Sequence, residues 1–174
     1  MSAVDRTQPP QATSTGTLLD RIQQDWKAVH PDLDTSAMVT LIALNRTSAL
    51  IMRALDTFFT QYNLSASAFD VLATLRRSAP PEGLNFTHLA ELMAVTPPAV
   101  TKRIDRLVEQ QLVERLPSAE DRRASFVRLT EQGRAVVNDV LPRHLENEER
   151  ILAQLTGQEQ RLLHHLLLKL SQAL

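Results

Sequence analysis

The 174-residue sequence contains no cysteine, four glycines, one tryptophan and one tyrosine. Without cysteine the chain has no disulfides, no thiolate metal ligands and no thiol nucleophile. The glycines, at positions 16, 83, 133 and 157, lie too far apart to form a phosphate-binding loop. The formal net charge is −1. No overall positive field therefore draws the chain to polyanions, and any nucleic-acid function must depend on local basic clusters.

Long apolar runs and a targeting segment are also missing from the sequence. No apolar run approaches 18 residues and no basic, apolar leader is evident, which predicts a cytoplasmic protein without a membrane partner. Frequent Leu and Ala, together with few glycines, favour a mainly helical fold with one core. Residues 1–16, rich in Ser, Thr, Pro and Gln, are expected to form a disordered tail.

Apolar residues recur every three or four positions over most of the chain. This spacing predicts helices at 17–30, 35–63, 65–77, 87–93, from Pro97 to about 111, 131–155 and 158–174. Residues 112–116 and 125–129 alternate in polarity, as hairpin strands do. The predicted fold is mainly α with a small β wing. A winged helix-turn-helix domain at 64–130 follows an additional N-terminal helix at 17–30, and it lies between long helices at 35–63 and 131–174.

The helix that begins at Pro97 is the candidate DNA-reading helix. Its apolar residues Val100, Ile104, Leu107 and Val108 are expected to face inward. Small and hydroxylated side chains at its start allow close approach to base edges, and its basic side chains reach phosphates or guanine. The candidate DNA contacts on this helix are Thr96, Pro98, Ala99, Thr101, Lys102 and Arg106. An ordinary solvated helix face with i,i+4 charge pairs fits the same pattern equally well.

The segment between the two predicted strands, SAEDRRA, contains two adjacent arginines. Arg122 and Arg123 are expected to project from the hairpin loop, where Glu120 and Asp121 can brace them. An arginine held on a hairpin suits the narrow, electronegative minor groove of DNA. A solvated turn is the weaker alternative, because a reading helix directly precedes this basic wing.

The segment Asp121-Arg122-Arg123, followed by FVRLT, resembles the D-x-R…V-x-L-T wing signature of MarR-family regulators. The preceding LAELMAVTPPAVTKRIDRLVEQQLVER is similar to that family's helix-turn-helix, and the resemblance covers about residues 35–174. It implies a homodimer whose N- and C-terminal helices form the interface, on a double-stranded pseudo-palindromic operator with half-sites about 10 bp apart. It also implies that Arg123 enters the minor groove and that Asp121 orients it.

Four further residues resemble the urate-responsive branch of the family, the HucR, PecS and MftR type: Trp26, Asp70, Arg103 and Arg115. The resemblance implies that the tryptophan and an arginine hold a small aromatic anion, that the aspartate senses its charge, and that another arginine couples it to the reading helix. Each residue also has a structural alternative: Trp26 as a packing anchor, Asp70 with Arg103 as an ion pair, and Arg115 as a strand surface residue. Further candidate pocket residues are Met38, Ile42, Asn45 and Arg46.

The resemblance predicts the class of the effector, a planar anion, but not its identity, since urate, a hydroxylated nicotinate and a phenolic acid all fit such a site. An enzyme is the first rival function, but His144, His164 and His165 have no metal-ligand spacing, and no metal or cofactor is expected. A purely structural helical dimerisation module is the second rival. A dimerisation module does not explain why the predicted wing is basic.

Overall fold

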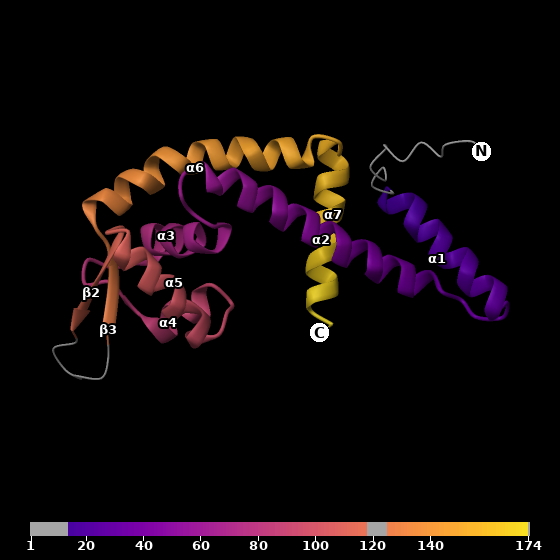
Figure 1. Cartoon of the computed structure of the whole chain (residues 1–174), viewed down its shortest axis with the longest axis horizontal. Coiled ribbons are helices and arrows are strands. Elements are labelled where there is room, and N and C mark those ends of the chain that lie inside the picture. The colour runs from indigo at the N-terminus through magenta and orange to yellow at the C-terminus, as the bar shows by residue number, and fades with distance from the viewer. Residues whose placement is uncertain (1–13, 118–124, 174) are drawn as a thin grey trace, which may run out of the picture. The chain divides into compact units, whose positions relative to one another are not determined.

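The computed structural model describes residues 14–117 and 125–173, which belong to two compact units, residues 1–53 and 54–174. The described part is mostly helical with one small antiparallel sheet, as the sequence predicts (Figure 1). Its elements are α1 (Thr15–Val29), α2 (Ser36–Thr60), α3 (Ala66–Ser78), β1 (Leu84–Asn85), α4 (Phe86–Leu92), α5 (Pro97–Glu109), β2 (Val113–Pro117), β3 (Ser125–Leu129), α6 (Glu131–Leu152) and α7 (Gly157–Ser171).

The first unit contains α1 and most of α2. The Ser14 hydroxyl accepts the Thr17 amide at 3.2 Å and caps α1, so Thr15 and Gly16, assigned by sequence to the tail at 1–16, are helical. Residues 1–13 of that predicted tail lie outside the described residues. The helix ends at His30, since the residue before a proline resists helical geometry. No residue of α1 is buried.

Helix α2 begins behind an aspartate and ends in the core of the second unit. The Asp34 carboxylate accepts the Ser36 amide at 2.9 Å, and its hydrogen bonds with Ser36 lower the pKa of Asp34. Phe58 and Phe59 are buried in the last turns of the helix. By length and composition alone, α2 is long and apolar enough to cross a membrane, with a mean hydropathy of 1.3. No continuous apolar run in α2 approaches 18 residues, because polar residues such as Asn45 interrupt it, so the helix has this hydropathy only as an average.

The second unit contains the winged helix-turn-helix, built from α3, α4, α5 and a sheet of strand order β1-β3-β2 (Figure 1). The hairpin of β2 and β3 is the predicted wing, and Val113 pairs with Leu129 at its base. Strand β1 was not predicted, because two residues are too few to show a period in polarity. It pairs Leu84 with Val127. Gly83 precedes it at φ 92°, and a Cβ there would lie 2.5 Å from the Val127 carbonyl oxygen.

One apolar core holds this unit together, with contributions from α2, α3, α4, α5, the sheet and α6. Val100, Ile104 and Leu107 are fully buried along one face of α5, as predicted. Val108 was expected to join them, but its side chain is 37% exposed. A residue next to Leu107 is turned about 100° around the helix axis, so both cannot point into the same core.

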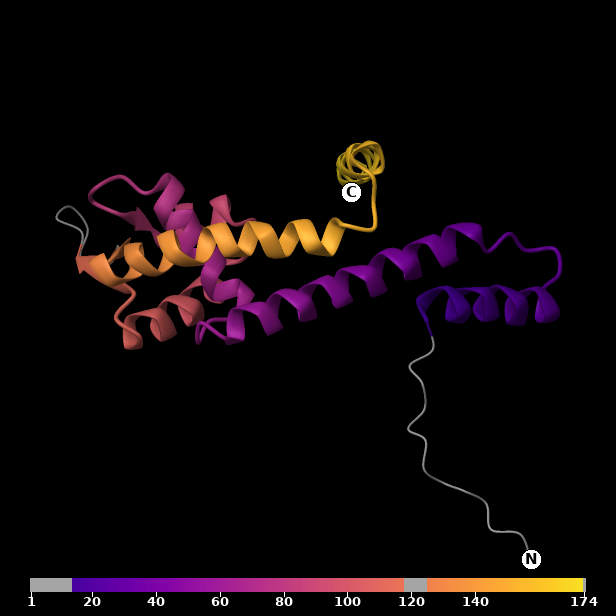
Figure 2. The ribbon, with the colours of Figure 1, turned by 90° about the horizontal axis from the view of Figure 1, so that it is seen from above.

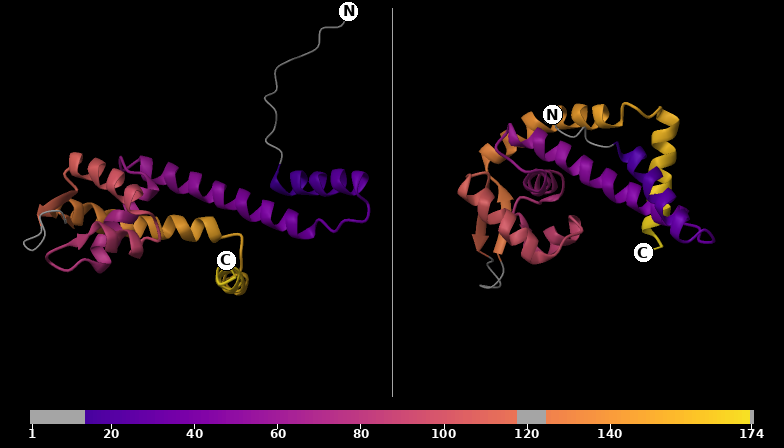
Figure 3. Two further views of the ribbon diagram at one scale, coloured as in Figure 1. Left: turned by 90° about the horizontal axis from the view of Figure 1, so that it is seen from below. Right: turned by 45° about the vertical axis from the view of Figure 1, so that its right-hand side comes forward.

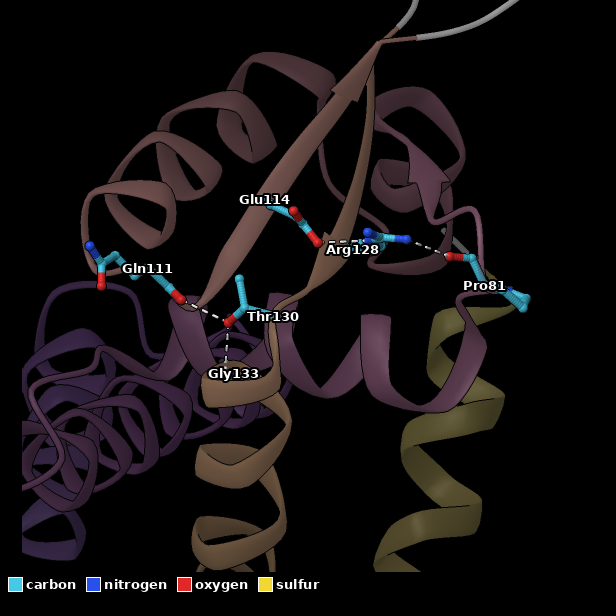
Figure 4. Close-up of polar contacts among 6 residues, drawn as sticks. All are labelled: Pro81, Gln111, Glu114, Arg128, Thr130 and Gly133. Atoms are coloured by element: carbon cyan, nitrogen blue, oxygen red, sulfur yellow. Dashed lines mark hydrogen bonds and ion pairs between the residues drawn. The ribbon is translucent and has the colours of Figure 1, made fainter.

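The wing is joined to α6 by a small network of hydrogen bonds and one close backbone contact. The Thr130 hydroxyl donates to the Gln111 carbonyl at 2.7 Å and accepts the Gly133 amide at 3.0 Å, which caps α6 (Figure 4). A Cβ on Gly133 would overlap the Leu112 carbonyl oxygen. The first turn of α6 is therefore packed directly against the start of β2, and from there α6 runs away from the sheet (Figures 2 and 3).

Candidate nucleic-acid interface and effector site

Helix α5 is positioned by the turn that separates it from α4. Ala94 adopts φ 52° in this turn, and the Val95 amide donates to the Ala90 carbonyl at 3.0 Å, a helix-ending pattern that redirects the chain. Thr96 is the N-cap of α5, but its side chain makes no capping hydrogen bond. Pro97 and the next residue, also proline, lack amide hydrogens, so the hydroxyl is not needed there and can serve another partner.

The outer face of α5 presents the predicted DNA contacts to solvent. The side chains of Thr96, Pro98, Thr101, Lys102 and Arg106 are exposed and that of Ala99 is half-buried. Lys102 and Arg106 lie one turn apart. The solvated-face alternative expects acidic partners within the helix, but among the described residues neither Lys102 nor Arg106 forms an ion pair. The face therefore keeps two uncompensated positive charges.

The predicted wing contacts Asp121, Arg122 and Arg123 lie outside the described residues. The strands that lead to them are described, and the last backbone pair is Pro117 with Ser125. Residues 118–124 follow β2 and precede β3 in the sequence, and their role as a wing tip stays a prediction.

The predicted effector residues divide between the two units of the chain. Trp26 belongs to the first unit and is 40% exposed; its ring stacks on His30 with 5.9 Å between centroids. Asp70, Arg103 and Arg115 belong to the second unit. The first unit also contains the other candidates, of which Ile42 is half-buried and the rest are exposed: Met38, Ile42, Asn45 and Arg46. A pocket that joins the two sets stays a prediction.

Within the second unit, Arg115 on β2 reaches the reading helix. Its guanidinium forms an ion pair with Asp105 of α5 and lies 5.2 Å from the centre of the Phe86 ring. Asp70 and Arg103 are both half-buried, and the described residues show no ion pair between them. Sequence reasoning missed Phe86 and the role of Asp105, since no local spacing signals a contact between a strand and a preceding helix.

The histidines considered as metal ligands do not gather in the described part of the chain. There, no group of three His, Cys, Asp or Glu residues is placed to hold a metal ion. His144 is half-buried, with its ring centre 4.8 Å from that of Phe59 and Nε2 3.2 Å from the Glu148 carboxylate. This histidine therefore packs on aromatic rings.

Comparison with known proteins agrees with this architecture. Residues 62–124 match the model of the MarR family. The chain is 39% identical over 146 residues to the HTH-type transcriptional regulator PecS of Dickeya dadantii, a match that covers 84% of this chain and 88% of PecS. The chain belongs to the MarR family. It is therefore a DNA-binding transcriptional regulator rather than an enzyme, and the resemblance to the branch that includes PecS is confirmed.

Solved structures of MarR-family regulators share the fold. A MarR variant from E. coli complexed with operator DNA is 24% identical, with a TM-score of 0.64, over 83% of this chain and 96% of that one. Bordetella bronchiseptica BpsR, whose DNA binding is regulated by 6-hydroxynicotinic acid, is 24% identical, with a TM-score of 0.68, over 76% of this chain and 98% of that one. At this identity the two structures support the fold alone.

Proposed function

We propose that this MarR-family regulator is a cytoplasmic homodimeric repressor. It binds a double-stranded, pseudo-palindromic operator and releases it when a small planar aromatic anion binds. Candidate effectors are urate, a hydroxylated nicotinate or a phenolic acid. The observation that carries the DNA-binding half of the proposal is the face of α5 with two exposed basic side chains and no acidic partner among the described residues.

On DNA, α5 enters the major groove, where Lys102 and Arg106 contact phosphates or guanine edges and the small side chains of Ala99 and Thr101 allow close approach. The Thr96 hydroxyl, which makes no capping bond, is available for a phosphate oxygen. Arg123 on the wing tip enters the adjacent minor groove with Asp121 as its orienting partner, and Arg122 contacts a phosphate.

The dimer proposal rests on apolar side chains that this chain does not bury. Helix α7 has no buried residue, and six of its leucines are large exposed hydrophobic residues: Leu162, Leu163, Leu166, Leu167, Leu168 and Leu170. An apolar surface of this kind marks an interaction site. Two-fold symmetry of a dimer places two reading helices on two half-sites of one operator.

Release of the operator depends on the ion pair between Arg115 and Asp105, which the effector disrupts. Both side chains are partly exposed, 40% and 53%, and such pairs contribute only about 0–1 kcal/mol. An anionic effector that pairs with Arg115 therefore displaces Asp105 at little cost. The displaced carboxylate on α5 and the repelled Asp70 then move the reading helix, and Arg103 transmits the change. 6-Hydroxynicotinic acid, which regulates the DNA binding of BpsR, belongs to this class of planar anion.

A gel-shift titration tests the DNA half of the proposal. The full chain is titrated with palindromic and scrambled duplexes at physiological salt, and we expect a clear preference for a palindrome. Lys102→Ala reduces affinity for all sequences and lowers the salt slope by about 1, whereas Lys169→Ala in α7 leaves both unchanged. Arg123→Ala weakens binding strongly with the fold and dimer intact. Equal affinity for every duplex favours the rival function, a dimerisation module.

A thermal-shift screen tests the effector half. Urate, 6-hydroxynicotinate and salicylate are compared, since a specific ligand raises the melting temperature by mass action. Trp26→Ala and Arg103→Ala are expected to reduce both the shift and ligand-driven release of DNA. Arg103 lies on the reading helix, so DNA binding by its variant is measured first. A ligand response identical to that of the unmodified protein removes these residues from the pocket.

A further inference from the structure

A cavity of about 340 Å³ lies at the base of the wing, within the second unit. We call it the wing-base cavity. The end of α3 and the loop that follows form one wall, and β3 with the start of α6 forms the other. Its lining residues are Leu75, Arg76, Ala79, Pro80, Pro81, Arg128, Leu129 and Arg134. None of the residues proposed for the effector site belongs to this lining.

Three guanidinium groups line the wing-base cavity, and within the described ranges only one of them has an acidic partner. Arg128 donates to Glu114 at 2.7 Å and to the Pro81 carbonyl at 3.5 Å (Figure 4). Arg76 donates to the uncharged Asn138 side chain at 3.2 Å. Arg134 forms no side-chain hydrogen bond or ion pair with any residue in the described ranges. The cavity lining contains no acidic side chain, so it has an excess of positive charge.

Helix stabilisation explains some of these arginines but not all of them. Arg76 lies in the last turn of α3, where a cation interacts favourably with the negative end of the helix dipole. Arg128 is held by the cross-strand carboxylate of Glu114. Arg134 lies four residues after the N-cap Thr130 of α6, and at that end the dipole disfavours a cation. A bound anion would supply the missing compensation for Arg134.

The size and the remaining lining of the cavity indicate an organic anion rather than an inorganic one. A water molecule occupies about 30 Å³, whereas binding pockets for small molecules begin at about 300 Å³. Leu75, Leu129 and the pair Pro80-Pro81 provide apolar contact surface beside the guanidinium groups. Guanidinium groups bind carboxylates through paired, charge-assisted hydrogen bonds.

We propose that the wing-base cavity is a second binding site, for a small organic carboxylate with an apolar body. Arg134 and Arg76 bind the carboxylate, and the leucines and prolines contact the apolar body. This site is separate from the proposed effector site and does not depend on it. Because Arg128 belongs to β3, the ligand lies beside the strand that leads to the wing tip.

Benzoate tests the proposal in a thermal-shift titration of the full chain, with benzyl alcohol as the uncharged analogue and inorganic phosphate at matched ionic strength. The titrations use an Arg115→Gln background, which removes the guanidinium proposed for the effector site. We expect benzoate to stabilise this background and the other two compounds to do so far less. Stabilisation by phosphate equal to that by benzoate overturns the assignment to an organic anion, as does an equal effect of benzyl alcohol.

Arg134→Gln, added to the same background, is expected to weaken benzoate binding about tenfold or more, because it removes one charge-assisted contact. Arg134 is exposed, so the variant folds. Arg76→Gln on the opposite wall has the same effect, and Arg150→Gln, an exposed arginine at the far end of α6, has none. A benzoate response that is absent in the Arg115→Gln background, or unchanged by Arg134→Gln, overturns the second site. If Arg115→Gln leaves the thermal shifts caused by urate and 6-hydroxynicotinate unaltered, the effector proposal fails, while the benzoate response of the Arg134 variant still tests this one.

Discussion

Helices α5 and α7 have similar apolar patterns in sequence but opposite environments in the structure. Val100, Ile104 and Leu107 of α5 are fully buried in the core of the winged helix. Helix α7 has no buried residue, and Leu162 and Leu166 are 56% and 51% exposed. Burial of one leucine contributes about 1.5–3 kcal/mol. The winged helix thus buries its apolar face within one chain. The leucines of α7 contribute a comparable stabilisation only when they pack against another surface.

The largest expected effect is in α5. Leu107→Ala opens a cavity in a fully packed core and is expected to cost about 2–5 kcal/mol of the free energy of unfolding. Denaturant unfolding measures the loss, and sedimentation is expected to show an unchanged monomer–dimer equilibrium. A loss below about 1 kcal/mol would mean that this region is not the rigid core described above.

The next effect is at the junction of the wing with α6. Gly133→Ala places a methyl group on the Leu112 carbonyl oxygen and is expected to cost about 1–3 kcal/mol. Gly157→Ala in α7 is the matched control, since its nearest atom is 3.6 Å away at the end of the flexible Arg161 side chain. Equal stability of the two variants would show that α6 is not packed closely against β2.

A substitution in α7 tests whether its exposed leucines pack against a second copy of the chain. Leu166→Ala is expected to weaken the proposed homodimer by about 1–2 kcal/mol, a factor of about 5–30 in its dissociation constant. Analytical ultracentrifugation over a range of protein concentrations measures this, with Lys169→Ala as the control on the same helix. An unchanged dissociation constant would assign the exposed leucines to a partner other than a second copy.

A smaller effect is expected for the cap of α6. Thr130→Ala removes the acceptor for the Gly133 amide and the donor to the Gln111 carbonyl, at a cost of about 1 kcal/mol. Thr130→Ser keeps both hydrogen bonds and is expected to retain most of the stability. Thermal unfolding compares the two. A serine variant as unstable as the alanine variant would assign the effect to the lost methyl group instead.

The smallest effect is a pH dependence at the start of α7. Hydrogen bonds from the side chain and the backbone amide of Thr156 lower the pKa of Glu159 below its ordinary value of 4.5. A lowered pKa in the folded state stabilises the helix start above about pH 4.5, and this stability is lost as the pH falls through the lowered value. Hydrogen exchange in α7 between pH 3 and 6 measures it, and Glu159→Gln is expected to remove the dependence.

Local signals were sufficient for most helix positions and for several of their caps. Ser65 and Thr130 cap α3 and α6 through side-chain hydrogen bonds to amides three residues later, and such bonds depend only on nearby residues. Strand β1 escaped prediction because its partner Val127 lies far along the chain. Val108 was misplaced because a run of two apolar residues does not show which of them faces the core.

The candidate sites likewise contain some features that the sequence predicts and others that it does not. The residues of α5 that face solvent follow from the helical period, and their contact with DNA stays a prediction. The contact of Arg115 with Asp105 and Phe86, and the three arginines of the wing-base cavity, join separate elements. No spacing in the sequence indicates such meetings, because they depend on how the elements pack.

The helices, the wing strands and the family could be predicted from the sequence, because periodicity, capping and motif spacing are properties of neighbouring residues. Which apolar faces are buried and which charges are compensated depends on tertiary packing. Helix α5 buries its leucine while α7 exposes its own, and Arg128 has a carboxylate partner while Arg134 has none in the described residues. Burial and ion pairing depend on contacts between distant segments, which similar local patterns do not distinguish.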